Sequence, residues 1–194
     1  MILGDNIFYG NGFSHTLRES VRKAEHGIAT IVGYYVTDPE RFGIVEFDKN
    51  GKVISVEEKP QRPKSNYAIT GLFFYPPGVS DFARRVKPSD REELDITTLN
   101  EMFLNQGNLC VELLGRGFAW LDTGTMDSLL EAGEFVLMIE KKQCIKISVL
   151  EEFGYRNGWI SRESQMVSAD KYGKFPYGQH LRIVAEGKIV SLSE

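Results

Sequence analysis

The pattern of hydrophobic and polar positions predicts strands alternating with helices over the first 142 residues. Runs of β-branched and aromatic residues bounded by Gly, Pro or Asn are typical of buried strands, and they fall at 28–36, 44–48, 53–57, 67–75 and 109–114. Apolar residues at helical spacing predict helices over 11–26, 79–86, 95–106 and from 125 onward. Asn50-Gly51 joins two of the strands as a hairpin. We therefore predict an α/β fold with a mixed, mostly parallel sheet flanked by helices.

From residue 145 onward the pattern changes to short helices separated by glycine and aromatic residues. Ser161 and Glu163 are typical of the start of one of them. This tail carries no visible chemistry of its own, and we expect it to pack on the sheet or on another subunit. The predicted division is an α/β domain over 1–142 and a C-terminal helical segment over 143–194.

Two acidic residues stand at places where an α/β sheet collects ligands. Residues 118–125 predict a buried strand that ends in Asp122, then a glycine turn, then a helix capped by Thr125. Asp5 follows Ile2 and Leu3, which resemble the tail of a strand. Ligands lie beyond the carboxyl ends of such strands, and Mg²⁺ is held by one or two carboxylates plus phosphates. We predict that Asp5 and Asp122 bind Mg²⁺; the alternative is that each is a cap or turn residue.

Composition excludes several other classes of protein. The 194 residues carry a formal charge of −4, which argues against a nucleic-acid footprint. No apolar run approaches the roughly 20 residues of a membrane helix, and no signal peptide is visible. The two cysteines lie in unrelated segments, so reduced thiols in a cytoplasmic protein are expected. The three histidines are scattered, which argues against a zinc site.

Six short motifs recur in order along the chain, at 3–10 (LGDNIFYG), 38–43 (DPERFG), 57–60 (EEKP), 65–68 (SNYA), 93–97 (ELDIT) and 119–125 (AWLDTGT). Together they resemble the motifs of the glucose-1-phosphate thymidylyltransferases, which are nucleotidyltransferases of the dTDP-rhamnose pathway with a Rossmann-like fold. The family begins with a glycine-rich loop that wraps the triphosphate, and this chain lacks it. The chain therefore looks like the C-terminal two-thirds of such an enzyme.

The resemblance implies a reaction between dTTP and glucose 1-phosphate with Mg²⁺, which gives dTDP-glucose and pyrophosphate. It implies small-molecule substrates, neither a nucleic-acid nor a membrane partner, and a homo-oligomer, since the family is commonly tetrameric. Two alternatives remain open. One is a uridylyl- or other sugar-1-phosphate nucleotidyltransferase. The other is that this chain alone is a non-catalytic sugar-phosphate-binding or assembly module.

The resemblance also implies roles for individual residues. Lys59, Asp122 and Asp5 would be catalytic, with both aspartates on the metal. Substrate binding would fall to Asn6, Gly43, Glu58, Lys59, Ile69, Arg91 and Trp120. Without the family, each has an ordinary reading: an Asx turn, a loop glycine, a solvated charged strand end, core residues, or a surface arginine. Arg116 could bind an anion at a regulatory site.

Glu58 and Lys59 pose a geometric difficulty. Neighbours in a strand point to opposite faces. These two side chains can therefore reach one ligand only if the end of the strand twists.

Overall fold

The computed structural model describes residues 1–88 and 94–189. The chain forms two compact units, which we call unit 1 (Met1–Gly124) and unit 2 (Thr125–Glu194). Within the described residues, no helix is both long enough and apolar enough to cross a membrane.

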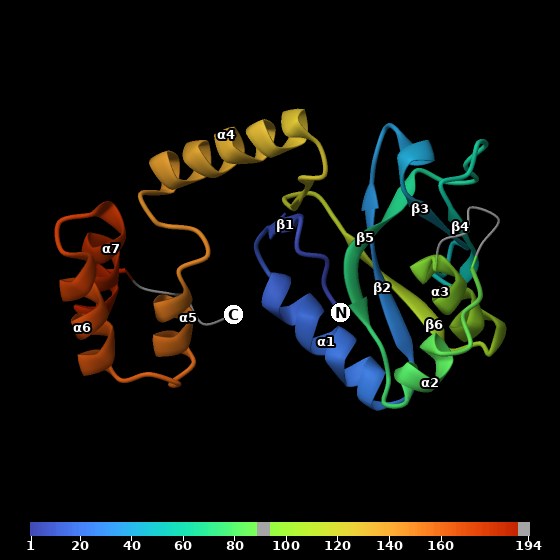
Figure 1. Ribbon diagram of the computed structural model, residues 1–194, viewed down its shortest axis with the longest axis horizontal. Coiled ribbons are helices and arrows are strands. Elements are labelled where there is room, and N and C mark those ends of the chain that lie inside the picture. Colours follow the sequence, from blue (N-terminus) through green and yellow to red (C-terminus); the bar gives the residue numbers. More distant parts are fainter. Residues whose placement is uncertain (89–93, 190–194) are drawn as a thin grey trace. The chain divides into compact units, whose positions relative to one another are not determined.

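A five-stranded mixed sheet forms the centre of unit 1 (Figure 1). Its strands, in spatial order, are β4 (Val53–Glu58), β3 (Gly43–Phe47), β5 (Tyr67–Phe74), β2 (Ala29–Tyr35) and β6 (Leu109–Leu114). The α/β class and the mixed sheet are confirmed. The expectation of a mostly parallel sheet was wrong, because among the described strands only β2 and β6 pair in parallel. Parallel neighbours need a long crossover connection, and the hairpin between β3 and β4 cannot supply one.

A second, two-stranded sheet joins β1 (Asn6–Tyr9) to β7 (Ala119–Asp122) in antiparallel register. The expected strand tail at residues 2–3 is only an isolated bridge, from Ile2 to Leu72 of β5. The strand follows Asp5 instead of preceding it, so Asp5 does not lie at the carboxyl end of a strand. The reason is packing: Phe8 of β1 anchors the strand against the buried cluster that includes Leu72.

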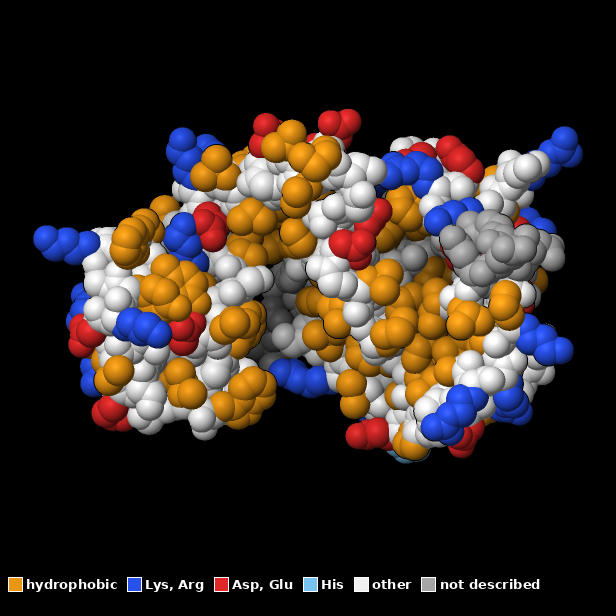
Figure 2. Space-filling model, viewed as in Figure 1, with side chains coloured by type: hydrophobic (Ala, Val, Ile, Leu, Met, Phe, Trp, Pro, Cys, Tyr) orange, Lys and Arg blue, Asp and Glu red, His pale blue; other side chains and the backbone are white. Residues whose placement is uncertain are grey.

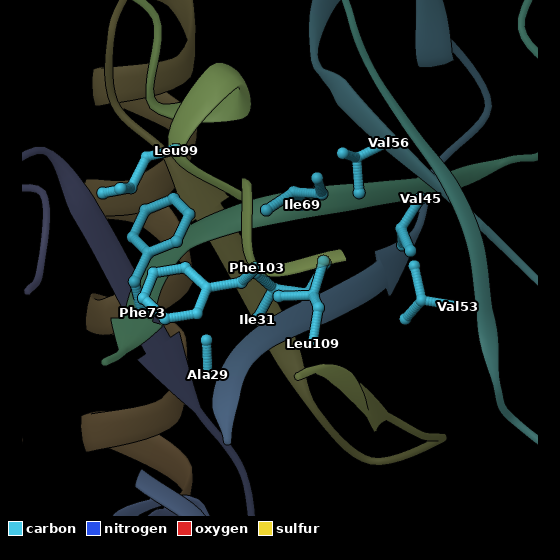
Figure 3. Packing of buried hydrophobic residues seen from close by; sticks show 10 residues of the cluster. All are labelled: Ala29, Ile31, Val45, Val53, Val56, Ile69, Phe73, Leu99, Phe103 and Leu109. Carbon is cyan, nitrogen blue, oxygen red and sulfur yellow. The ribbon is translucent and has the colours of Figure 1, made fainter. Parts of the chain in front are cut away.

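Helices cover both faces of the larger sheet (Figure 1). On one face, α1 (Phe13–Glu25) packs Phe13 and Leu17 against Val32 and Leu114. The other face carries α2 (Val79–Ala83) and α3 (Ile96–Asn105). Figure 3 shows Leu99 and Phe103 of α3 beside Phe73, Ile69 and Ile31 of the sheet. This core fixes α3 over the sheet and so positions the residues at the beginning of α3.

The helix boundaries mostly follow the sequence, with one exception at α2. That helix begins as predicted, after a left-handed Gly78, but it ends at Ala83 and does not reach residue 86. The short 3₁₀ helix η1 (Pro39–Arg41) lies between β2 and β3.

Over residues 125–189, the regular structure of unit 2 is helical: α4 (Met126–Gln143), α5 (Leu150–Arg156), α6 (Arg162–Tyr172) and α7 (Pro176–Ala185). The predicted cap at Thr125 is confirmed, since its side chain accepts from Ser128 N–H in a capping box. The Ser161 side chain likewise accepts from Ser164 N–H at the start of α6. A small core of Val149, Ala169 and Leu181 holds the last three helices together.

Both units expose hydrophobic side chains. On α4 only Ala132 is buried, whereas Leu129 is 52% exposed. Figure 2 shows hydrophobic side chains gathered on the visible face of unit 1. Its exposed hydrophobic residues include Met1, Ile2 and Leu3.

Candidate functional site

A cleft of about 260 Å³ opens in unit 1 where β1, β4, β5 and β7 meet the beginning of α3. Most of the predicted site residues line it: Asn6, Gly43, Glu58, Lys59, Ile69, Trp120 and Asp122. Asp5 precedes Asn6 and lies beside Asp122. Arg91 lies outside the described residues. Arg116 is exposed in the turn between β6 and β7 and does not line the cleft.

Pairing of β1 with β7 brings the two aspartates together. Asn6 lies opposite Asp122 in the ladder. The backbone N–H and the hydroxyl of Thr123 both donate to the carbonyl oxygen of Asp5, each at 2.8 Å. The pKa of the Asp122 carboxyl is raised above its ordinary value, mainly by partial burial and next by the negative charge of Asp5. Arg41, Lys59 and a backbone hydrogen bond from Gly124 act in the opposite direction. Two carboxylates that repel each other in this way form a site that a cation would stabilise.

The donor set fits a magnesium ion. Mg²⁺ takes oxygen ligands, and proteins commonly supply one or two carboxylates while water and substrate phosphates supply the rest. Among the described residues there is no group of three or more His, Cys, Asp and Glu side chains that could hold a metal by itself. Asp5 and Asp122 would therefore hold the ion as a pair and leave its other positions open to ligands in the cleft.

The end of β4 resolves the difficulty over Glu58 and Lys59. Lys59 has a φ of +43°, in the left-handed region that non-glycine residues seldom adopt. Its N–H donates to the carbonyl oxygen of Phe42 at 3.0 Å, which holds this turn of the backbone. Regular strand alternation is broken at Lys59, and both residues line the cleft.

Glu58 is held from two sides. The hydroxyl of Thr97, a buried residue at the start of α3, donates to Glu58 Oε2 at 2.6 Å. Gly43 lies opposite Glu58 in the β3–β4 ladder. A Cβ added at Gly43 would lie 3.1 Å from Glu58 Oε2 and 3.4 Å from Thr97 Oγ1. The glycine therefore allows close packing of the carboxylate, beyond serving as a loop turn.

Trp120 forms an aromatic wall of the cleft. Its indole Nε1–H donates to Asn6 Oδ1 at 2.6 Å. Its ring meets Phe42 and Tyr34 edge to face, with centroids 5.2 and 5.9 Å apart. Ile69 of β5 belongs both to the core and to the cleft. A cleft lined by a fixed indole and an aliphatic side chain offers an apolar surface to a small-molecule ligand.

The cleft residues that sequence reasoning did not name include Thr97 and Arg41. Both fall inside motifs that the sequence singled out, at 93–97 and 38–43. Arg41 Nη1 pairs with Asp38 Oδ2 at 2.7 Å, and its guanidinium lies 5.3 Å from the centroid of the Phe42 ring. With Lys59, it brings positive charge close to Asp122. Only the fold shows that these two side chains reach the cleft.

Comparison with known proteins places the molecule in a class. Residues 1–138 match the model of the nucleotidyl transferase family, and the chain belongs to that family. The resemblance read from the short motifs is thereby confirmed. Enzymes of this kind generally need a divalent metal ion.

The similar curated proteins are more particular. The chain is 52% identical over 181 residues to the glucose-1-phosphate thymidylyltransferase of Neisseria gonorrhoeae, an alignment that covers 93% of this chain and 62% of that protein. It is 47% identical over 181 residues to that of Mycobacterium tuberculosis strain H37Rv, with the same coverage. The chain thus spans about 62% of the length of these relatives.

A solved structure agrees with these relatives. It is a Bacillus anthracis protein assigned as a glucose-1-phosphate thymidylyltransferase and crystallised with sucrose. It matches with a TM-score of 0.60 and 39% identity, over 69% of this chain and 52% of that one.

Proposed function

We propose that this chain is the sugar-phosphate and metal side of a Mg²⁺-dependent glucose-1-phosphate thymidylyltransferase, which forms dTDP-glucose and pyrophosphate in the dTDP-rhamnose pathway of the cytoplasm. The observation that carries the proposal is the meeting of Asp5 and Asp122, far apart in sequence, at the rim of a cleft that also holds Glu58, Lys59 and Trp120. The relatives named above support the choice of dTTP and glucose 1-phosphate.

Each residue has a chemical task in this proposal. Lys59 and Arg41 neutralise the phosphate of glucose 1-phosphate, Glu58 accepts a hydrogen bond from a sugar hydroxyl, and Trp120 packs beside the ring. Mg²⁺ bound at Asp5 and Asp122 would supply positive charge to the phosphates of both substrates. A sugar phosphate oxygen then bonds to the α-phosphorus of dTTP, and the bond from that phosphorus to the leaving pyrophosphate breaks. Such transfers depend on positioning and charge neutralisation, so no protein nucleophile is required.

Pyrophosphate release from dTTP and glucose 1-phosphate tests the proposal. The assay compares this chain with the same chain preceded by the N-terminal segment of the N. gonorrhoeae relative, each with and without Mg²⁺. We expect Mg²⁺-dependent release from the longer protein and a large loss in its Asp122→Asn variant. If neither protein releases pyrophosphate, the proposed enzymatic activity is wrong. Strong preference for UTP over dTTP identifies a uridylyltransferase, and sugar-phosphate binding without release in either protein identifies a binding module.

We also propose that residues 1–142 carry the chemistry and that residues 143–194 serve assembly into a homo-oligomer. The family match ends at residue 138, which supports this division. Unit 2 exposes Leu150, Trp159 and Phe175, each more than 70% exposed, as an interface to a second copy would require. Sedimentation of the chain tests this directly: a monomer at all concentrations contradicts it.

A further inference from the structure

Three hydrogen bonds converge on the side chain of Asn6. Its Oδ1 accepts from Trp120 Nε1–H at 2.6 Å and from the backbone N–H of Gly71 in β5 at 3.0 Å. Its Nδ2 donates to Asp5 Oδ1 at 2.9 Å. One carboxamide therefore touches a proposed metal ligand, the aromatic wall of the cleft and the central sheet.

The orientation of this carboxamide is determined by its partners. Trp Nε1–H and a backbone N–H can only donate, and a carboxylate can only accept. A flipped amide would set its own N–H groups against two donors and its oxygen against Asp5. Of the common side chains, only asparagine combines an acceptor for two N–H groups with a donor to a carboxylate at this length.

The sheet leaves room for this arrangement at one place. A Cβ added at Gly71 would lie 2.7 Å from Asn6 Oδ1 and 2.8 Å from both Asn6 Cγ and Leu3 Cβ. Contacts this short would push the carboxamide away from the strand. The absence of a side chain at Gly71 therefore allows the Asn6 carboxamide to pack against β5.

We propose that Asn6 is a positioning residue, which locks the Asp5 carboxylate and the Trp120 indole into one unit, so that metal binding and the wall of the sugar cleft are coupled. The metal part of this proposal rests on the proposed function. The link between Asn6 and Trp120 does not. Neighbours that orient a metal ligand typically contribute about 10- to 100-fold in metal affinity.

Two measurements on the full chain test the coupling. In ¹⁵N-tryptophan-labelled protein, the two indole N–H resonances belong to Trp120 and to Trp159, which is 78% exposed and serves as the reference for a solvated indole. The Mg²⁺ dissociation constant is measured by calorimetry with saturating glucose 1-phosphate.

In the unaltered chain, we expect the Trp120 resonance to lie apart from that of Trp159 and to move on addition of Mg²⁺. Asn6→Ala should bring the Trp120 resonance toward the solvated position and raise the Mg²⁺ dissociation constant about 10- to 100-fold. Gly71→Ala should have the same two effects, because its Cβ would displace the Asn6 side chain from the hydrogen bond with Gly71 N–H. Asn66→Ala is the matched control: Asn66 is equally half-buried and donates one hydrogen bond, to Val36 O, away from the cleft.

Asn6→Asp separates a specific role from a general structural one, since it keeps the acceptor for Trp120 but loses the donor to Asp5. We expect its Trp120 resonance to stay near the unaltered position. The inference is overturned if folded Asn6→Ala keeps both the resonance and a dissociation constant within twofold of the unaltered chain. It is also overturned if Asn6→Asp moves the resonance as far as Asn6→Ala does. If the unaltered chain shows no Mg²⁺ response, the proposed metal site fails, and the indole resonances alone still decide whether Asn6 holds Trp120.

Discussion

The hydroxyl of Thr97 is expected to set the affinity of the cleft for sugar phosphate. Thr97 is 4% exposed and donates to Glu58 Oε2 at 2.6 Å. Thr97→Val keeps the β-branched shape and nearly the same volume, and it removes only this donor from the carboxylate. Glu58 then keeps its charge but loses the bond that aims it into the cleft.

The magnitude follows from the kind of hydrogen bond. Bonds to charged groups contribute about 1.5–3 kcal/mol, and each 1.4 kcal/mol is a factor of about ten in a dissociation constant. Thr97→Val should therefore raise the dissociation constant of glucose 1-phosphate by about ten- to a hundredfold. The hundredfold increase is an upper limit, because it is reached only if the displaced Glu58 carboxylate no longer contributes to binding.

Calorimetric titration with glucose 1-phosphate measures this change, and thermal unfolding checks the fold. Thr30→Val is the matched control, because Thr30 is fully buried in β2 and bonds Cys110 Sγ at 3.1 Å, outside the cleft. Both variants should lose some stability, but only Thr97→Val should lose affinity. Equal affinities in Thr97→Val and the unaltered chain would show that Thr97 does not orient Glu58 for binding.

Three further predictions follow from the same cleft. Gly43→Ala should weaken glucose 1-phosphate binding in calorimetry, because its Cβ would lie 3.1 Å from Glu58 Oε2. Unchanged affinity would show that the Glu58 carboxylate moves aside without loss of binding. Arg41→Gln should weaken glucose 1-phosphate binding in the same assay. Arg84→Gln is the control and should not, although each arginine pairs with an aspartate three residues earlier at 2.7 Å. Equal effects of the two substitutions would show that Arg41 does not bind the phosphate. The raised pKa of Asp122 implies that its contribution to stability in metal-free buffer is present at acidic pH and is lost as pH rises through that pKa. Asp5→Asn should then raise the melting temperature at neutral pH in a chelator, and a lower melting temperature would contradict the repulsion.

Much of the fold could be read from local patterns. Asn50-Gly51 predicted the β3–β4 hairpin, and the Thr125 cap and the strand at 109–114 appear where the sequence placed them. Each of these depends on interactions between residues close in the chain, such as a turn or a capping hydrogen bond, so the sequence alone is enough.

Long-range pairing could not be read in the same way. The antiparallel ladder between β1 and β7 joins residues far apart in the chain, and no local sequence pattern near Asp5 predicts this pairing. The expectation that Asp5 ends a strand failed for this reason, and Asp5 lies near Asp122 through the β1–β7 ladder instead. Thr97 and Arg41 were missed because their roles come from how α3 and η1 pack. Lys59 was predicted, but the sequence could not show how it shares one cleft with Glu58, because that depends on its left-handed backbone.

A calorimetric titration of the chain with Mg²⁺ in saturating glucose 1-phosphate tests most directly whether Asp5 and Asp122 share one metal ion. We expect one ion per chain, with binding lost in both Asp5→Asn and Asp122→Asn while the circular dichroism of both variants stays unchanged. Asp127→Asn, which changes an exposed residue of α4, should bind as the unaltered chain does. If Asp122→Asn binds Mg²⁺ as tightly as the unaltered chain, the two aspartates do not share an ion and the proposed metal site is wrong.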